Sequence, residues 1–355
     1  MKEIEIYTKE DLFKIGKCDK FPKDGNYKLM NDITFEKDYF NEEMFEVIYS
    51  FSGTFDGNNH CIKNVITDEY KIILDPGLFI KLDESAIVEN LILDNWQYYI
   101  SECSGMLCSE NYGIIRNCKI RNSNISILMS EDDDENYEVS YIGSFAYSNL
   151  GKIINCEIEN LTINSVSDSI FNFSSINVGG IVSENKSIID GCKIKNLSIN
   201  NCKCYIGGIA YINHENSKIS NCKIDLNINY GDYVGGICQE NHGIICNCDV
   251  SGFIENCGNN IASIVDYNGD SGQIQDCSFN VTISKSKSLE TSGLCNRVGS
   301  SKIKNCTGKS DIIIEMSDID LYTNEIDEGN TLENCSNTGN IKIQYKTKSG
   351  IIKEM

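Results

Sequence analysis

The stretch VGGICQENHGIICNCDV, residues 234–250, gathers residue types that bind metals or act as nucleophiles. Cys238, His242, Cys246 and Cys248 lie within it, and the last two form a Cys-x-Cys pair. A structural zinc site needs four convergent ligands, usually from turns in which two to four residues separate paired cysteines. No two cysteines of the chain are separated by two residues. The chemistry of this stretch therefore has to be weighed against the rest of the chain.

Cys248 belongs to an internal repeat. Each recurrent cysteine follows a short apolar segment and a polar residue or glycine, as in IINCEI (153–158) and ISNCKI (219–224). Small, nearly apolar thiols at equivalent inward positions predict a ladder in the protein core. Disulfides and a metal site are the alternatives. The recurrent cysteines are Cys118, Cys156, Cys192, Cys222, Cys248, Cys277, Cys306 and Cys335.

A second segment keeps step with the first and reads VGGIV (178–182) or IGGIA (206–210), followed by a tight turn. A third apolar run, such as NLTI (160–163), follows the cysteine. Each repeat therefore predicts about three short strands joined by turns. Because one such coil cannot bury its apolar face alone, the coils must stack and share a core. The pattern predicts an all-β right-handed parallel β-helix (a solenoid) of about nine to ten coils, roughly 45 Å long.

The residue before each recurrent cysteine indicates where the backbone turns. Only Asn, Asp and Gly occur there, and these types tolerate positive φ better than other residues. We therefore expect a left-handed or bulged corner at each position, which lets the flanking side chains both point inward. The corner residues are Asn117, Asn155, Gly191, Asn221, Asn247, Asp276, Asn305 and Asn334.

Two longer stretches, VGGICQENHGIICNCDVSG and IGGIAYINHENSKISNCKI, resemble the GLUG repeat of bacterial surface proteins. In that repeat a Gly-Gly-hydrophobic segment, a turn and Ile-x-Asn-Cys follow one another. The resemblance covers roughly residues 100–340, and residues 25–65 are similar to the coils that precede such repeats. It implies a β-helix in a cell-surface or secreted protein, such as an adhesin-like or protease-associated one.

The N-terminal segment TKEDLFKIGK (8–17) predicts a short amphipathic helix, with Thr8 as its N-cap and Asp11 at the capping-box position. Its apolar residues could cover the first coil, whose unpaired strands would otherwise invite edge-to-edge association. We expect three parts in the chain: an N-terminal cap with opening strands (1–46), the parallel β-helix (47–345) and a C-terminal tail (346–355).

Two segments are candidate binding sites. The loop 130–136 (SEDDDEN) could offer several oxygen ligands to calcium, for which a solvated acidic loop is the alternative. The segment DNWQYYI (94–100) could stack sugars, for which aromatic residues capping an irregular coil are the alternative. No other cofactor is expected. The candidate binding residues are Glu131, Asp132, Asp133 and Asp134 in the loop, and Trp96, Tyr98 and Tyr99 in the aromatic segment.

Catalytic residues are not predicted. His214 and His242 lie in turns about one repeat apart, and we expect exposed turn residues rather than a general base or metal ligands. Glycoside hydrolysis needs paired carboxylates at a fixed separation, and lyases on this fold usually add a catalytic Arg or Lys to acidic calcium ligands. The three arginines (Arg116, Arg121 and Arg297) do not cluster with the acidic loop, and no Arg-x-Lys follows NHG at 241–243.

Charge and hydropathy limit the partners. Lys plus Arg is 31 and Asp plus Glu is 52, which gives a formal net charge of −21. This sign disfavours direct nucleic-acid binding and docking on anionic lipid. No apolar run is long enough for membrane insertion, and MKEIEIYTKEDLF lacks the basic and apolar regions of a signal peptide. Free thiols suit a reducing compartment, whereas the resemblance implies the cell surface, so the sequence leaves the location open.

From these features we predict a non-enzymatic binding or structural rod, adhesin-like or part of an appendage. It would present the insertions 128–139 and 165–176 to a carbohydrate or protein ligand, because loops on a rigid scaffold often carry function. One alternative is an acidic β-helix that mimics nucleic acid and inhibits a DNA-binding protein. A polysaccharide lyase or hydrolase is the other.

Overall fold

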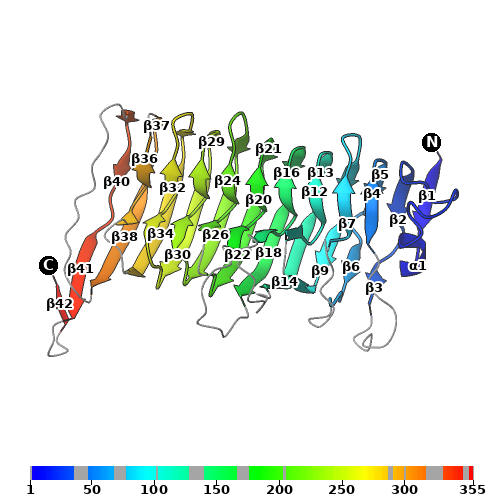
Figure 1. Cartoon of the computed structure of the whole chain (residues 1–355), viewed down its shortest axis with the longest axis horizontal. Coiled ribbons are helices and arrows are strands. Elements are labelled where there is room, and N and C mark those ends of the chain that lie inside the picture. The colour runs from blue at the N-terminus through cyan, green and yellow to red at the C-terminus, as the bar shows by residue number, and fades with distance from the viewer. Residues whose placement is uncertain are drawn as a thin grey trace, which may run out of the picture.

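The computed structural model describes residues 2–35, 47–67, 77–100, 103–127, 140–165, 176–202, 205–286, 291–299, 301–316, 331–346 and 352–354. These residues form a rod in which short strands stack side by side along the long axis, with the first residues at one end and the last at the other (Figure 1). Successive coils contribute one strand to each of the faces. The fold is a right-handed parallel β-helix, which confirms the predicted fold class.

Sheet 1 holds twelve strands, and the recurrent corner follows each of them from β13 to β39. Its inward column includes Ile115, Ile153, Ile189 and Ile219, which pair in register and are fully buried. Sheet 1 already begins at β1, near the N-terminus. It therefore contains more strands than the nine to ten coils that the sequence predicts. Its strands are β1 (Glu3–Ile6), β2 (Asn26–Leu29), β5 (Thr54–Asp56), β8 (Ile87–Glu89), β13 (Ile114–Arg116), β17 (Lys152–Ile154), β21 (Ile188–Asp190), β25 (Lys218–Ser220), β29 (Ile244–Cys246), β33 (Gln273–Gln275), β37 (Lys302–Lys304) and β39 (Thr331–Glu333).

Sheet 2 follows the corner and contains the longest strands. Its named pairs are parallel except for β41 with β42, which is antiparallel. The strands on its main path are β3 (Ile33–Thr34), β6 (Cys61–Lys63), β9 (Ile92–Asp94), β14 (Lys119–Ile127), β18 (Glu157–Ser165), β22 (Lys193–Asn200), β26 (Lys223–Asn229), β30 (Asp249–Glu255), β34 (Ser278–Ser286), β38 (Thr307–Met316), β41 (Ile341–Lys346) and β42 (Ile352–Glu354). Beside them, β10 (Gln97–Ile100) pairs with β14, and β40 (Ser336–Asn337) pairs with β38.

Sheets 3 and 4 complete each coil and meet at the Gly-Gly segment. Sheet 3 contains β11 (Ser104–Gly105), β15 (Ser140–Gly143), β19 (Ile176–Gly179), β23 (Tyr205–Gly207), β27 (Tyr233–Gly235), β31 (Asn260–Ala262) and β35 (Thr291–Ser292). Sheet 4 contains β4 (Ile48–Phe51), β7 (Phe79–Leu82), β12 (Cys108–Asn111), β16 (Ala146–Asn149), β20 (Val182–Asn185), β24 (Ala210–Asn213), β28 (Cys238–Asn241), β32 (Val265–Asn268) and β36 (Cys295–Val298).

The two glycines of the Gly-Gly segment are required for different reasons. A Cβ at Gly235 would overlap the carbonyl oxygen of Cys238, which lies three residues later in the same coil. A Cβ at Gly236 would overlap the carbonyl oxygen of Ser263 in the next coil. The first glycine therefore permits the tight bend between sheets 3 and 4, and the second permits close stacking of coils.

The eight corner residues have left-handed backbone conformations, with φ between 53° and 67°. A Cβ-bearing residue at positive φ is strained, and Asn, Asp and Gly carry the smallest penalty. The Asn, Asp or Gly that precedes each recurrent cysteine therefore follows from the backbone of the coil.

A second ladder runs through the last residue of successive strands in sheet 4. Asn185, Asn213, Asn241 and their equivalents are fully buried, and each Nδ2 donates to the Oδ1 of the next coil at 2.6–2.9 Å. Buried amides need such partners, because an unpaired buried polar group is costly. The ladder contains Asn111, Asn149, Asn185, Asn213, Asn241 and Asn268 and ends on Ser301 Oγ.

The N-terminal helix α1 (Lys9–Leu12) is shorter than the segment 8–17 and lies at the end of the rod (Figure 1). Thr8 is its N-cap, and Thr8 Oγ1 accepts a hydrogen bond from Asp11 N at 3.2 Å. Leu12 and Ile15 are buried in the core cluster. Among the described residues, no helix has the length and apolar character needed to cross a membrane.

Candidate functional site

The recurrent cysteines lie just inside the corner on successive coils. All are buried except the partly exposed Cys335, and all have free thiols. Each Sγ contacts the carbonyl oxygen two residues earlier, as Cys248 does with Cys246 at 3.3 Å. Burial raises the pKa of the Cys156 thiol, so that thiol stays protonated and is a poor nucleophile at neutral pH. Within the described part of the chain, no group of three or more His, Cys, Asp or Glu is placed to hold a metal ion.

The two turn histidines have carboxylate partners, and the expectation of exposed turn residues is wrong. His242 Nε2 lies 2.7 Å from Glu240 Oε1 in the same coil, and His214 Nε2 lies 3.7 Å from Glu184 Oε1 in the preceding coil. Both imidazoles are half-buried, with about a third of each side chain exposed or less. The pairing of His214 with Glu184 spans two coils, which a turn motif considered on its own does not reveal.

Glu184 also pairs with Lys186, whose Nζ lies 2.5 Å from Glu184 Oε2. The nearby His214 imidazole and the contact with Lys186 together outweigh desolvation and lower the pKa of Glu184 to about 2. This carboxylate is therefore charged at any pH near neutral and holds two side chains of the turn in place.

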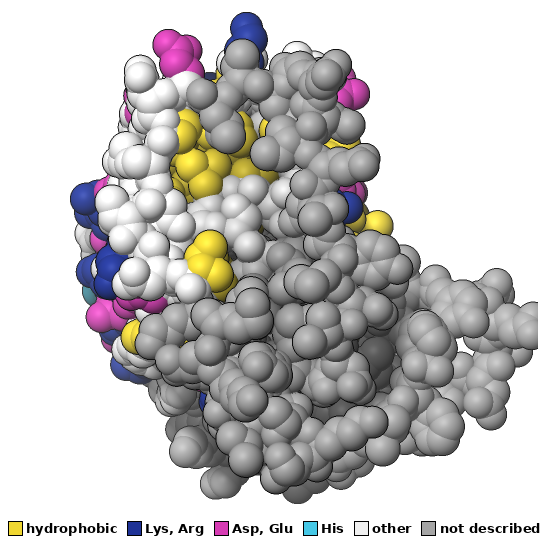
Figure 2. All heavy atoms as spheres, turned by 90° about the vertical axis from the view of Figure 1, so that its left-hand side faces the viewer, with side chains coloured by type: hydrophobic (Ala, Val, Ile, Leu, Met, Phe, Trp, Pro, Cys, Tyr) yellow, Lys and Arg dark blue, Asp and Glu magenta, His cyan; other side chains and the backbone are white. Residues whose placement is uncertain are grey.

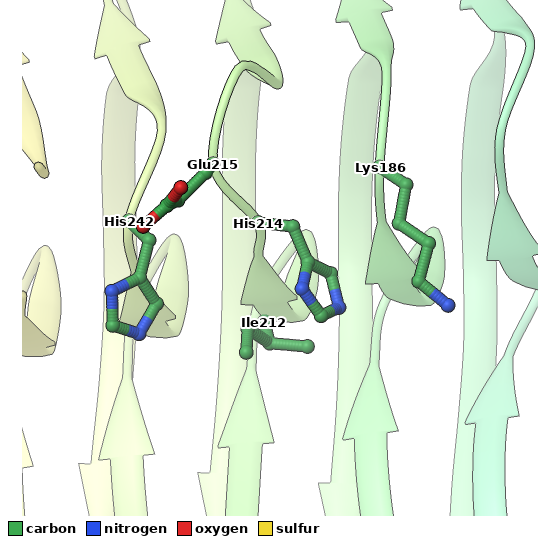
Figure 3. A pocket seen from close by; sticks show the side chains of 5 residues that line it. All are labelled: Lys186, Ile212, His214, Glu215 and His242. Carbon is green, nitrogen blue, oxygen red and sulfur yellow. The ribbon is translucent and has the colours of Figure 1, made fainter.

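An open hollow of about 500 Å³ lies over these turns and is lined by Lys186, Ile212, His214, Glu215 and His242. Lys186, His214 and His242 come from three successive coils and lie in a row, with Ile212 beside His214 (Figure 3). They follow the buried asparagine ladder by one residue, since His214 N donates to Asn185 O and His242 N donates to Asn213 O. The rigid ladder thus fixes the spacing of the row.

A strip of tyrosines lies next to the hollow, and we call Tyr141, Tyr147, Tyr205, Tyr211 and Tyr233 the tyrosine strip. Rings from sheets 3 and 4 meet across the Gly-Gly bend: the Tyr205 and Tyr211 centroids are 5.7 Å apart, and those of Tyr141 and Tyr211 are 6.4 Å apart. Tyr205 and Tyr233 stack on neighbouring coils. All five side chains are half-buried, which leaves part of each accessible to a ligand.

Four hydroxyl groups of the strip, those of Tyr141, Tyr147, Tyr205 and Tyr211, are neutral at ordinary pH. Burial raises the pKa of Tyr141 and Tyr205 above the ordinary value. Burial likewise raises the pKa of Tyr147, whose hydroxyl lies 3.0 Å from Glu110 Oε1 and donates to it. The strip therefore combines neutral aromatic rings with nearby carboxylates that accept hydrogen bonds.

Three buried polar atoms lie in strands next to those that carry the strip. Within the described residues, Ser109 Oγ, Asn177 Oδ1 and Gln239 Oε1 have no hydrogen-bond partner, although these residues are only 2–3% exposed. Asn177 pairs in register with Tyr141 and Tyr205 in sheet 3, and Gln239 follows Tyr211 by one coil in sheet 4. An unpaired buried oxygen costs about 1–3 kcal/mol. Such atoms indicate a place where an ordered water completes the hydrogen bonding.

A buried aspartate with several hydrogen-bond partners lies toward the C-terminal side of the tyrosine strip. Asp266 is fully buried and accepts hydrogen bonds from Gln239 Nε2 at 2.8 Å, Asn296 Nδ2 at 3.1 Å and Arg297 NH2 at 2.9 Å. The Arg297 guanidinium also lies over the Tyr267 ring, 5.1 Å from its centroid. These donors satisfy the hydrogen-bonding capacity of the Asp266 carboxylate. They hold the side chains at the C-terminal side of the strip in place.

The aromatic segment 94–100 is not the surface that the sequence suggested. Trp96 and Tyr98 are fully buried, and Trp96 Nε1 donates to Ile62 O at 2.9 Å, so neither ring can stack a sugar. Tyr99 is half-buried on the opposite side of the same strand. The four acidic candidates Glu131, Asp132, Asp133 and Asp134, and with them the calcium hypothesis, lie outside the described residues.

The tyrosine strip was not predicted from the sequence, although the repeats contain a pattern that indicates it. Tyr141, Tyr205 and Tyr233 each precede an Ile-Gly or Val-Gly pair at the same repeat position. Comparing this position across repeats would have shown a recurrent aromatic residue beside the Gly-Gly bend. The contacts of Tyr141 and Tyr205 with Tyr211 depend on the bend between sheets 3 and 4.

Fold and site together define a parallel β-solenoid protein with an aromatic strip along one side. No family model matches the chain, and no curated protein matches it. A solved structure named IgA1 protease is similar, with a TM-score of 0.44 and 14% identity over 85% of this chain and 21% of its own. A provisionally assigned immunoglobulin A1 protease from Bacteroides ovatus has a TM-score of 0.40 and 16% identity over 99% and 91%. The chain thus spans about a fifth of the first structure, and no activity is transferred from either.

Proposed function

We propose that this protein is a non-enzymatic binding rod that holds a carbohydrate on its tyrosine strip. The observation that carries the proposal is the combination of half-buried tyrosine rings with carboxylates beside them, such as Glu110 next to Tyr147. Binding sites for small ligands are mostly apolar with a few convergent polar groups. A sugar offers an apolar ring face to the tyrosines and hydroxyl groups to these carboxylates.

The setting that we propose for this rod is adhesin-like, as the GLUG-like repeats imply. The insertions 128–139 and 165–176 remain candidates for further ligand contacts. The first ends directly before the strand of Tyr141, and the second ends at the start of the strand of Asn177. A protein ligand would use the same surface, and the binding experiment below separates the two.

The nucleic-acid mimic needs a continuous stripe of carboxylates, and the described strands support it less well. On sheet 2, Lys119, Glu157, Lys193, Lys223 and Asp249 form one column. Ion pairs of 3.5–3.8 Å join Glu157 to both neighbouring lysines and join Lys223 to Asp249. Along the flank seen from the C-terminal end, Lys and Arg side chains lie among Asp and Glu side chains (Figure 2).

A sugar-cleaving enzyme needs a carboxylate free to act as acid or nucleophile. Glu184 is bound by Lys186 and His214, and Glu240 by His242. This pairing supports binding over catalysis. Release of reducing sugar from any bound polysaccharide, measured with and without calcium, would replace the binding proposal with an enzymatic one.

The test is a glycan array followed by calorimetric titration with each saccharide that binds. We expect Tyr211→Ala and Tyr205→Ala to lose most of the affinity. Phe253→Ala is the matched control, because Phe253 is a 54% exposed aromatic residue on sheet 2, away from the strip. The proposal fails if no saccharide binds, or if the two tyrosine variants bind as tightly as the control.

A further inference from the structure

The side chains of the tyrosine strip alternate from coil to coil. The second position of successive strands in sheet 4, from β12 to β28, carries Ser109, Tyr147, Ser183, Tyr211 and Gln239. Polar and aromatic residues thus take turns over five coils. Neighbouring coils are about 4.8 Å apart, so the two tyrosines recur after roughly 10 Å.

The third position of the same strands alternates as well. Glu110, Glu184 and Glu240 stand on the coils that carry Ser109, Ser183 and Gln239. Each tyrosine of this column therefore lies between two coils that bear a carboxylate, as the Tyr147 hydroxyl bonded to Glu110 illustrates. The small polar residues at the second position are buried, so a ligand that follows the strip meets a ring, then a carboxylate, then a ring again.

This two-coil period has the symmetry of one kind of polymer. In an extended β-1,4-linked polysaccharide each sugar is turned over relative to the previous one, so the same face recurs every second unit. One hexose unit of such a chain is close in length to the spacing between coils. Alternate sugars can therefore stack on Tyr147 and Tyr211, while the units between them present hydroxyls to the glutamates of the intervening coils.

The negative charge along the strip indicates which of these polysaccharides it can bind. Glu110, Glu184 and Glu240 lie along the strip, and the whole chain carries a formal net charge of −21. Lys186 is held by Glu184, and Arg297 is held by Asp266. A polyuronate or sulfated chain would bring its own negative charges against these carboxylates. An uncharged chain avoids this repulsion and can donate hydroxyl hydrogens to the carboxylates.

We propose that the strip binds a linear, uncharged β-1,4-linked polysaccharide parallel to the rod axis, with one sugar unit on each coil. This inference rests on the proposed carbohydrate-binding function and adds the linkage, charge and direction of the ligand. The register of sheet 3 supports the direction, since Tyr141, Asn177, Tyr205, Tyr233 and Asn260 lie in one column along the same axis.

The experiment is a calorimetric titration with cello- and chito-oligosaccharides of two to seven units, alongside maltohexaose and oligogalacturonate of six units. We expect affinity to rise with each added unit up to about five, which is the number of coils in the alternating column, and then to level off. The hexamers of the α-linked and acidic sugars should bind about tenfold more weakly or not at all.

Variants of Tyr211 test whether the tyrosines that recur every second coil bind the ligand. Tyr211→Ala should weaken hexamer binding about fivefold to tenfold, because one stacked ring is lost. Tyr211→Phe should retain most of the affinity and guards against a folding defect in the alanine variant, and circular dichroism checks the fold of each. Phe253→Ala should bind as the unaltered protein does.

Two failures are distinguishable. If no saccharide binds at all, the proposed function falls and this inference falls with it. If saccharides bind with an affinity that is independent of length, or if the acidic or α-linked hexamer binds as tightly as the β-linked one, the carbohydrate function stands. In that case the axial, uncharged β-1,4-linked ligand is overturned.

Discussion

Tyr205 and Tyr233 stack on neighbouring coils, with ring centroids 4.8 Å apart and ring planes inclined by only 16°. Their Cα atoms are partners in the pairing of β23 with β27, so the ring spacing follows the strand spacing. Rings fixed in this way lose little side-chain entropy when a ligand arrives, which favours binding. The β-helix thereby converts a sequence repeat into a preorganised aromatic surface.

The ring pair also stabilises the coil that carries it. Tyr205→Ala removes stacking with Tyr233 and contact with Tyr211, and we expect a loss of about 1–2 kcal/mol in the free energy of unfolding. Tyr205→Phe keeps the ring and should lose less than about 0.5 kcal/mol. Urea unfolding followed by circular dichroism measures both. Equal losses in the two variants would show that the hydroxyl, not the ring, makes the contribution.

The buried asparagine ladder should be sensitive to interruption. Asn213 Nδ2 donates to Asn241 at 2.8 Å, and Asn213 Oδ1 accepts from Asn185 at 2.8 Å and Ser217 at 2.7 Å. Asn213→Ala leaves buried partners unpaired, and we expect a loss of about 3 kcal/mol. Asn227→Ala, on the exposed face of β26, is the control and should change stability by less than about 0.5 kcal/mol. A urea midpoint for Asn213→Ala close to that of the control would contradict a structural role for the ladder.

The corner at Asn247 tests the backbone argument. Its φ is 54° and its side chain is exposed, so a substitution changes backbone strain with little change in packing. We expect Asn247→Ala to lose about 1 kcal/mol and Asn247→Val to lose more, because a β-branched side chain is least compatible with positive φ. Asn247→Gly should be close to neutral. Thermal unfolding of the three variants gives the order, and an alanine variant more stable than the glycine variant would refute the strain explanation.

Acid should weaken the turn around Glu184. Its pKa is about 2 in the folded protein, below the ordinary value of 4.5. The stabilisation is therefore complete above pH 4.5 and is lost as the pH falls toward 2. The full shift corresponds to about 3 kcal/mol, and solvent screening of this half-buried site reduces the expected change to about 1–2 kcal/mol. Urea unfolding at pH 6 and pH 3 should show a smaller acid-induced loss for Glu184→Gln than for the unaltered protein, and equal losses would count against the pairing.

Thiol accessibility separates the cysteine ladder from a reactive site. Cys18 is exposed, whereas Cys156 and Cys192 are buried. Burial also raises the pKa of Cys156. Iodoacetamide at pH 7.5 should modify Cys18 in the folded protein, and Cys156 and Cys192 only after unfolding in urea. Peptide mass spectrometry assigns the sites. Rapid alkylation of Cys156 in native buffer would contradict a packed core ladder.

The histidine–carboxylate pairs and the buried aromatic residues show where inference from the sequence stops. His242 pairs with Glu240 two residues away, but His214 pairs with Glu184 thirty residues earlier. Trp96 and Tyr98 form a conspicuous aromatic segment, yet both face the core. The histidine pairs depend on the direction of side chains near a turn, and the burial of the aromatic residues depends on which face of β10 points inward. Residue type and spacing specify neither.

The sequence by itself determined the coil. Its period, the inward Ile and Cys, and the Asn, Asp or Gly at each corner are local requirements of backbone conformation and burial, and they recur because each coil meets the same neighbours. Only the tertiary structure decided which surface can bind. Tyr141, Tyr205, Tyr211 and Tyr233 come from two sheets and three coils, and they meet because the Gly-Gly bend brings sheets 3 and 4 together. The physical reason is that a repeat fixes what lies above and below each residue, whereas contacts across a bend depend on the three-dimensional path of the whole coil.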